Sequence, residues 1–365
     1  MKGTFELAEY IYVDFDELKT VCTEILKAEK FPEEKASEIV DVLVEADARN
    51  IPSHGIARLE RYIKERDAGF IDCFSEPETI FETPISAIVD GKDGPGQCVS
   101  KKSMELAIGK ASKNMIGLIS VRNSNHYGIT AYYSEMALKN NMMGIAMTNS
   151  YPLVVPTYGK ESVLGTNPIS IAIPGKTHPF LLDMATSVIT RGKLEVYNRL
   201  EKKIPDGWAI DEKGKSTESP SHVIKNFNER NFGGILPLGG LGENFSGHKG
   251  FGLSVLVDLL TAGFSLGQFS AETYTTNNAG VCHFFGAIDL KTFGNVEEIK
   301  DKVDQIINSI VNSEKADGQK KIYYHGEKEY EARKESLKNG MKILKNTFDK
   351  IKKLASDKHI TMAQQ

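Results

Sequence analysis

Five short runs rich in β-branched and other apolar residues recur through the middle of the chain, and they constrain the fold more than any other feature. Two stretches with helical spacing, residues 99–113 and 129–140, lie between them. Strands and helices that alternate at this spacing are typical of an α/β domain. The predicted strands are residues 87–89, 116–121, 144–149, 169–173 and 180–183.

Helical patterns dominate the N-terminal part of the chain. The first 70 residues predict three helices, which begin after Asp14, at Pro32 and at Ser53. Asp14 and Ser53 are residue types that cap helices, and proline is favoured in the first turn. Gly69 is placed to end the third helix.

Two amphipathic helices are predicted at the other end of the chain. The first carries the isoleucines between residues 299 and 310, and the second runs from about residue 327 to 354. We therefore expect a helical domain built from both ends of the chain, next to an α/β domain. The predicted division is residues 1–75 plus 295–365 for the helical domain and residues 76–294 for the α/β domain.

Composition narrows the class of protein. The net charge is −4 over 365 residues, so no basic excess indicates nucleic acid or an anionic membrane as a partner. The four cysteines include no CxxC pair, which favours a reducing compartment over a disulfide framework or a zinc ribbon. The longest apolar run, residues 251–266, carries Asp258 and predicts a buried helix. With no apolar leader at the N-terminus, we expect a cytoplasmic protein.

The most informative local stretch is residues 53–62. If its helix begins at Ser53, then His54, Arg58 and Tyr62 fall at i, i+4 and i+8 on one face. An imidazole, a guanidinium fork and a phenol in a row suit a small carboxylic acid. Spacing alone favours the alternative, which is an amphipathic helix with a solvated polar stripe.

Polar residues follow three of the predicted strands in succession. His126 lies in the polar segment after strand 116–121, Ser150 follows the next strand, and Asp183 ends strand 180–183. Ligands of α/β sheets usually bind at such strand ends. His126 is then either an acid/base group or a loop histidine with local hydrogen bonds. The succession of three polar strand ends favours a crevice.

Known catalytic and phosphate-binding motifs are mostly missing. Lys249 stands between glycines at the start of the helix that contains residues 251–266, where free amides and a lysine suit an anion. The spacing matches neither a P-loop nor the G-x-G-x-x-G fingerprint. No G-x-S-x-G, H-E-x-x-H or paired metal-ligand spacing occurs, so the sequence gives little support to a hydrolase and predicts no metal site.

Six motifs in this order resemble the malate/L-lactate dehydrogenase family that is distinct from the Rossmann-type enzymes and includes ureidoglycolate, sulfolactate and diketogulonate oxidoreductases. The resemblance spans roughly residues 15–345. It implies a non-Rossmann α/β fold, a homodimer with its site in a cleft, and NAD(P)-dependent oxidation of 2-hydroxy acids or reduction of 2-oxo acids. The motifs are Ser53-His54-Gly55 with Arg58 and Tyr62, residues 125–128, 165–168, 182–185, 248–252 and 283–289.

The resemblance also implies roles for individual residues. His54 is the first choice for the proton donor, His126 is the alternative or a polarising partner, Arg58 holds the substrate carboxylate, and Tyr62 supports His54 or the substrate. The residues implied in binding NAD are Ser150, Thr166, Asn167, Pro179, Asp183, Met184, Ala185, Thr186, His248, Lys249, Gly250, Gly326 and Glu327.

Two departures from the family pattern and several alternatives remain open. The family's Pro-Gly-Glu motif reads His325-Gly326-Glu327 here, and residues 191–232 form an elaborated connection with room for a short hairpin. Malate/oxaloacetate is the first choice of substrate. Lactate, sulfolactate, ureidoglycolate or a cyclic imino acid is the alternative, as is a non-catalytic dinucleotide-binding protein. NAD is preferred to NADP, although Arg191 can meet a 2′-phosphate.

Overall fold

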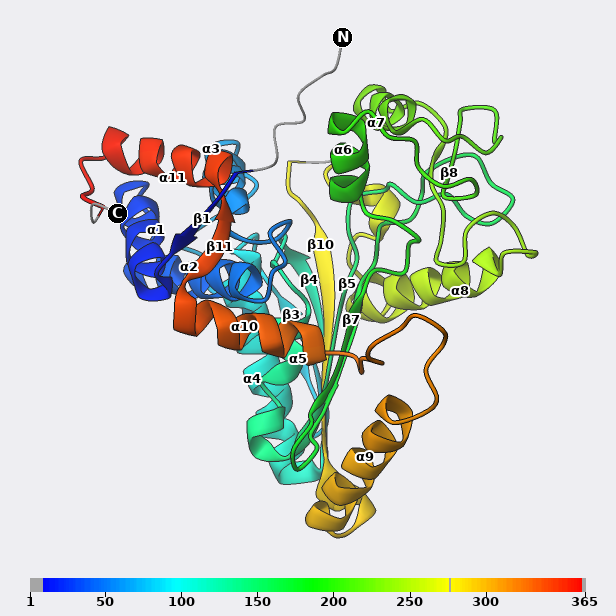
Figure 1. Cartoon of the computed structure of the whole chain (residues 1–365). Coiled ribbons are helices and arrows are strands. Elements are labelled where there is room, and N and C mark those ends of the chain that lie inside the picture. The colour runs from blue at the N-terminus through cyan, green and yellow to red at the C-terminus, as the bar shows by residue number, and fades with distance from the viewer. Residues whose placement is uncertain (1–8, 276, 363–365) are drawn as a thin grey trace.

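A seven-stranded sheet forms the centre of the computed structural model, which describes residues 9–275 and 277–362 (Figure 1). The strand order is β2-β3-β4-β10-β5-β6-β7. Only β3 and β4 pair in parallel, and every other neighbouring pair is antiparallel. The predicted α/β class is thereby confirmed, with a sheet order unlike a doubly wound one. The strands are β2 (Glu78–Glu82), β3 (Ser86–Asp90), β4 (Ile116–Ser124), β5 (Met142–Thr148), β6 (Ile169–Ile173), β7 (Phe180–Met184) and β10 (Val281–Asp289).

Helices cover the sheet on both sides. On one face lie α4 (Gly96–Asn114) and α5 (Ala131–Glu135), and on the other lie α8 (Gly247–Asp258) and α9 (Val296–Val311) (Figure 1). Gly117 and Gly144 allow close approach of the first pair, because a Cβ there would overlap the carbonyl oxygens of Ala107 and Ser134. This face holds a fully buried core that includes Ile119, Val121 and Phe285.

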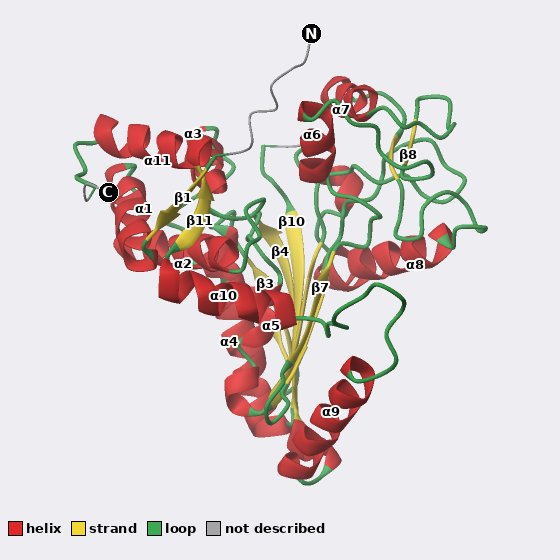
Figure 2. Cartoon of the chain, in the orientation of Figure 1, coloured by secondary structure: helices red, strands yellow, loops and turns green. Residues whose placement is uncertain are grey.

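A helical group stands beside the sheet and joins the two ends of the chain (Figure 2). Its helices lie around a two-stranded antiparallel pair, β1 with β11, and all of them except α10 contribute to one apolar core. Asp14 caps α1 as predicted, with Oδ1 accepting from the amides of Asp16 and Glu17 at 2.9 Å each. The members are β1 (Tyr10–Val13), α1 (Phe15–Ala28), α2 (Glu33–Ala48), α3 (Leu59–Asp67), α10 (Glu327–Asn339), β11 (Met341–Leu344) and α11 (Lys345–Asp357).

Two helix predictions were wrong in their extent. The helix expected from Ser53 begins at Leu59, after the short 3-10 helix η1 (Ile56–Arg58). The helix expected over 327–354 is interrupted at Gly340, whose φ of 88° lies in the left-handed region that glycine tolerates. The chain there enters β11 and pairs with β1, a long-range contact that outweighs the helical pattern.

The 191–232 connection folds into a lobe with its own core. It holds α6 (Arg191–Arg199), β8 (Ala209–Ile210) and α7 (Pro220–Glu229), and Leu194, Val223 and Phe227 are buried in it. Strand β8 pairs with β9 (Gly234–Ile235), just beyond the connection. The two helices were not predicted, because their composition is polar apart from a few inward residues.

The division into two domains remains a prediction. Helix α9, which we assigned by sequence to the helical domain, contacts the turn between β6 and β7: Asp304 Oδ2 accepts from the Thr177 amide at 2.8 Å. Among the described residues, no helix has the length and apolarity needed to cross a membrane.

Candidate active site

The loop that carries His54 lies between α2 and α3. Ser53 does not cap a helix: its hydroxyl lies 2.9 Å from His54 Nδ1, and its carbonyl accepts from Arg58 Nε at 2.7 Å. Gly55 is extended, with φ −83° and ψ −157°. The predicted helical face of His54, Arg58 and Tyr62 is therefore wrong in its backbone, because His54 precedes the helix.

Three of the predicted residues nevertheless come together. Tyr62 Oη lies 2.8 Å from His126 Nδ1, and the Gly128 amide donates to the same nitrogen at 3.4 Å. The rings of His54 and His126 stack with centroids 5.6 Å apart and an interplanar angle of 17°. Tyr62 is only 1% exposed, so its hydrogen bond to His126 is sheltered from water. Two motifs separated by more than 60 positions thus form one histidine pair.

Two arginines lie in the electrostatic field of this pair. Arg58 and Arg61 both lower the pKa of His54 and His126. Arg61 is held by Glu65, at 2.7 Å from Nε, and donates to Tyr274 Oη at 3.0 Å. The sequence analysis missed Arg61, although it stands next to Tyr62 in the same decapeptide. Helical spacing could have indicated it, because Arg61 is seven residues after His54 and would share its helical face.

Burial and the two arginines keep both imidazoles neutral at neutral pH. Burial, Arg58 and Arg61 together lower the pKa of His54 from 6.5 to about 4, with burial the largest cause. Burial, Arg61, His54 and Arg58 hold the pKa of His126 well below its usual range. Burial also raises the pKa of the Tyr62 phenol, which stays protonated. A neutral imidazole can accept a proton from a hydroxyl group, and a bound anion can favour its protonated form.

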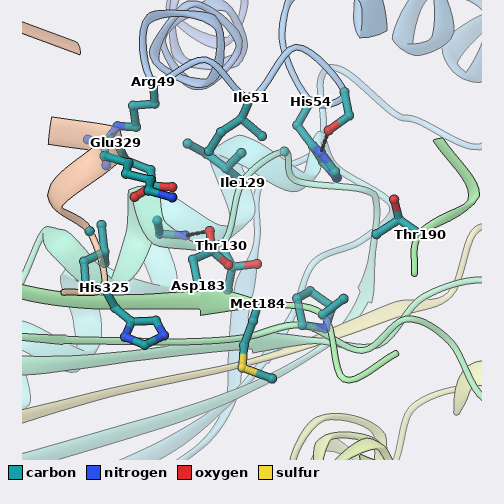
Figure 3. Close-up of a pocket in the computed structure, with 18 of the residues that line it drawn as sticks. Arg49, Ile51, His54, Ile129, Thr130, Asp183, Met184, Thr190, His325 and Glu329 are labelled. Carbon is teal, nitrogen blue, oxygen red and sulfur yellow. Dashed lines mark hydrogen bonds between the residues drawn. The ribbon is translucent and has the colours of Figure 1, made fainter. Parts of the chain in front are cut away.

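A cavity of about 490 Å³ opens from His54 toward the start of α10. His54 and Thr190 lie at one end of it and His325 at the other (Figure 3). Hydroxyl, apolar and cationic side chains line different parts of its wall. Among them are Ser53, Thr130, Thr166 and Thr190; Ile51, Ile129 and Met184; and Arg49 and Lys328.

Five of the predicted cofactor residues line this cavity: Thr166, Asp183, Met184, Ala185 and Gly326. Asp183 Oδ2 accepts from the Ala131 amide at 2.9 Å.

Two further predicted residues act on Thr166 without lining the cavity. The Ser150 hydroxyl accepts from the Thr166 amide at 3.0 Å, and the Thr186 hydroxyl donates to the Thr166 carbonyl at 3.2 Å. Both therefore fix the segment that presents Thr166 to the cavity.

The remaining predicted residues lie away from the cavity wall. Asn167 is buried and donates to the Ser254 carbonyl at 3.0 Å, which is a packing role. Glu327 pairs with Lys321 at 2.8 Å. The others are Pro179, just before β7, and His248, Lys249 and Gly250 in the first turn of α8, where His248 and Lys249 are exposed.

Arg49 is a cavity residue that the sequence analysis did not single out. It is 8% exposed, its Nε lies 3.3 Å from Glu45 Oε2, and its guanidinium also contacts Glu135. Arg333 of α10 joins the same network at 2.7 Å from Glu45. These charges attach α10 to α2 and α5, and so fix the distance between Gly326 and the His54 loop.

The side chains that line the cavity fit a dinucleotide. Apolar side chains next to His54 suit a flat ring, and the hydroxyls suit ribose. Lys328 Nζ, which lies 4.5 Å from the Tyr323 ring centroid near the start of α10, suits a phosphate. Among the described residues, no group of three or more His, Cys, Asp or Glu side chains is placed to hold a metal ion.

The chain is similar to known dehydrogenases. The profile of the malate/L-lactate dehydrogenase family matches residues 13–352. The chain is 47% identical to malate dehydrogenase from Pyrococcus abyssi, over 95% of this chain and 94% of that protein. It is 40% identical to L-sulfolactate dehydrogenase from Methanocaldococcus jannaschii, over 93% and 95%. The solved malate dehydrogenase from Pyrococcus horikoshii superposes with a TM-score of 0.88 at 41% identity, covering 97% of each chain.

The fold and the relatives together identify the chain as an oxidoreductase of the dehydrogenase class. Within that class, the chain belongs to the malate/L-lactate dehydrogenase family. The predicted resemblance is confirmed across nearly the whole sequence.

Proposed function

We propose that this enzyme interconverts malate and oxaloacetate with NAD(H). The observation that carries the proposal is the stacked pair of His54 and His126 in the field of Arg58 and Arg61, with His54 on the wall of a cavity of about 490 Å³. Malate has two carboxylates, and two guanidinium groups can meet both. The names of the relatives at 47% and 45% identity support the same substrate.

The residues divide the chemistry between binding and proton transfer. When bound, a nicotinamide exchanges hydride with the substrate carbon. Arg58 holds the 2-carboxylate, since its Nε is anchored on the Ser53 carbonyl and the rest of the guanidinium is available to a ligand. His54 gives a proton to the carbonyl oxygen during reduction and takes it back during oxidation. A carboxylate between the arginines offsets the positive field and favours the protonated imidazole.

His126 polarises the substrate oxygen in this proposal. The Gly128 amide can only donate to Nδ1, and Tyr62 can donate to the same atom, which favours a proton on Nε2. That Nε2–H is then available to donate toward the site. His54 differs, because its Nδ1 contacts the hydroxyl of Ser53, which can donate or accept.

For the cofactor, the cavity residues Thr166, Asp183, Met184, Ala185 and Gly326 are the proposed contacts, with Ser150 and Thr186 as supports. His248 and Lys249 are proposed to meet a part of the cofactor that extends beyond this cavity. NAD is proposed over NADP, and Arg191, which lies 3.0 Å from Glu195 and 3.0 Å from Asn228, is the residue that a 2′-phosphate would meet. Titration of NADH and NADPH by fluorescence tests this, and tighter binding of NADPH contradicts it.

Sulfolactate is the second candidate, since it is also a dianion and a relative at 40% identity bears its name. A panel of oxaloacetate, sulfopyruvate and pyruvate, followed at the NADH absorbance band, separates the possibilities. We expect kcat/KM to be highest for oxaloacetate. A higher kcat/KM for pyruvate contradicts a site built for a substrate with two negative charges. If no 2-oxo acid is turned over, the non-catalytic alternative is favoured.

We also propose a homodimer, supported by the surface of α8 and the residues that follow it. This helix buries Gly250, Ser254 and Asp258 and exposes Leu253 and Leu256, at 37% and 42%. The same apolar surface continues through Leu259 and Phe264, at 55% and 60% exposed. A helix that turns small and polar residues inward and leucines outward requires a partner surface.

A second copy of the chain is the proposed occupant of this surface. Sedimentation equilibrium at micromolar concentration tests the dimer, and a mass near 40.3 kDa, that of one chain, refutes it.

Four buried free thiols also agree with the expected reducing cytoplasm.

A further inference from the structure

The carboxylate of Asp47 lies directly beneath the loop that carries His54. Asp47 is in the last turn of α2 and is only 6% exposed. Its Oδ2 accepts a hydrogen bond from the Ile56 amide at 2.7 Å. This bond takes the first amide of η1, so the side chain of one helix sets where the next helical turn begins.

Gly55 rests on the same carboxylate. A Cβ at residue 55 would overlap both oxygens of Asp47. The loop therefore contacts Asp47 at the two residues that follow His54, once through a hydrogen bond and once through a close approach that only glycine permits. The close approach of Asp47 explains why the third residue of the Ser-His-Gly motif is glycine, and no contact between Gly55 and a ligand is needed.

Asp47 is buried without a cation beside it. Over residues 9–275 and 277–362, it forms no ion pair with a lysine, arginine or histidine. One neighbouring titratable group is the thiol of Cys22 on α1, whose pKa is raised by burial and, to a smaller extent, by Asp47. Burying a carboxyl group with a single amide partner costs free energy, so a sequence that served packing alone would do better with an apolar residue.

We infer that Asp47 is a positioning residue, which fixes the His54 ring against His126 through Gly55 and the Ile56 amide. This inference rests on the proposed function, in which His54 moves the proton. Few bonds separate the contacts of Asp47 from the His54 ring, because His54 is next to Gly55 in the sequence. The His54 ring in turn lines the cavity. Misplacement of a catalytic group by about 1 Å can cost roughly 100-fold in rate.

The structure supplies a matched control in Asp304 of α9. It is also nearly buried, it accepts from the amides of Thr177 and His178 at 2.8 and 3.3 Å, and a Cβ on Gly175 would overlap it. The geometry repeats that of Asp47 with Ile56 and Gly55, at the turn between β6 and β7, which carries neither histidine of the proposed proton transfer. A loss of backbone anchoring can therefore be separated from a loss of His54 positioning.

The experiment compares D47N, D47A and D304A in the full chain. We expect D47A to lower kcat for oxaloacetate reduction by about 10- to 100-fold, with the Kd for NADH within about twofold of the parent. D47N keeps the shape and an acceptor oxygen, so it should restore most of kcat. D304A should lower the Tm as D47A does and leave kcat unchanged. If D47A fails to fold, G55A gives the same comparison from the other side of the contact.

Hydrogen exchange at the Ile56 amide provides a readout that needs no turnover. We expect it to accelerate in D47A but not in D304A. Equal kcat in D47A and D304A overturns the inference, as does protection of the Ile56 amide that D47A leaves unchanged. If the parent reduces no 2-oxo acid, the proposed function fails by itself. The exchange data then still decide whether Asp47 holds the loop.

Discussion

Replacing Tyr62 by phenylalanine tests the histidine pair with the smallest change in shape. The substitution removes one hydroxyl, whose contact with His126 Nδ1 is 2.8 Å long in a fully buried setting. A neutral hydrogen bond of this kind contributes about 0.5–1.5 kcal/mol net. The Gly128 amide remains as a second donor at 3.4 Å, so Nδ1 is not left without a partner and the loss should not exceed that range.

The predicted effect of Tyr62→Phe falls on turnover. A loss of about 0.5–1.5 kcal/mol in orienting His126 corresponds to roughly 2- to 13-fold in kcat. Steady-state oxidation of NADH with saturating oxaloacetate measures it, and urea denaturation checks that unfolding free energy falls by no more than about 1.5 kcal/mol. The Kd for NADH should stay constant. An unchanged kcat, or a loss confined to NADH binding, refutes the role assigned to Tyr62 and His126.

Other substitutions test the remaining parts of the account. Arg58→Lys should cost about 1.5–3 kcal/mol in kcat/KM, because lysine cannot form the planar fork; unchanged kinetics remove Arg58 from the site. Arg61→Gln should reduce kcat/KM for oxaloacetate more than for pyruvate, and an equal loss for both contradicts a dianion site. Lys249→Ala should weaken NADH binding, measured by fluorescence titration, and an unchanged Kd limits the cofactor to the described cavity. Burial lowers the pKa of His283 from 6.5 to about 3. The stability that the neutral His283 side chain gives the folded protein is therefore present above pH 6.5 and is lost as the pH falls toward 3. Urea midpoints of His283→Gln should depend less on pH between 6.5 and 3 than those of the parent.

The strands of the sheet were predictable because their pattern is local. Ile169–Ile173 and Phe180–Met184 were found almost to the residue, since apolar runs between turns predict buried strands in any context. Strands β1 and β11 were missed for the opposite reason. Their pairing joins the two ends of the chain, Tyr10 with Leu344, so neither sequence reveals the partner that makes it a strand.

The site was predictable in its residues more than in its backbone. The structure brings His54, His126 and Tyr62 together, but the Tyr62 hydroxyl contacts His126, whereas the resemblance implied support for His54 or the substrate. The helical face used to connect His54 with Tyr62 does not exist. Asp47 takes the Ile56 amide and holds Gly55 extended, which delays the helix to Leu59. No local pattern contains that information, because the deciding carboxylate lies on the preceding helix.

The central claim is that His54 carries the proton in an oxidoreductase of 2-oxo acids, and kcat of His54→Ala for oxaloacetate reduction tests it most directly. General acid–base catalysis contributes roughly 10²- to 10⁴-fold. We predict a loss of kcat in that range, with the Kd for NADH nearly unchanged. A kcat within about tenfold of the parent in His54→Ala, alongside a loss of roughly 10²-fold or more in His126→Ala, would contradict the account and assign the proton to His126.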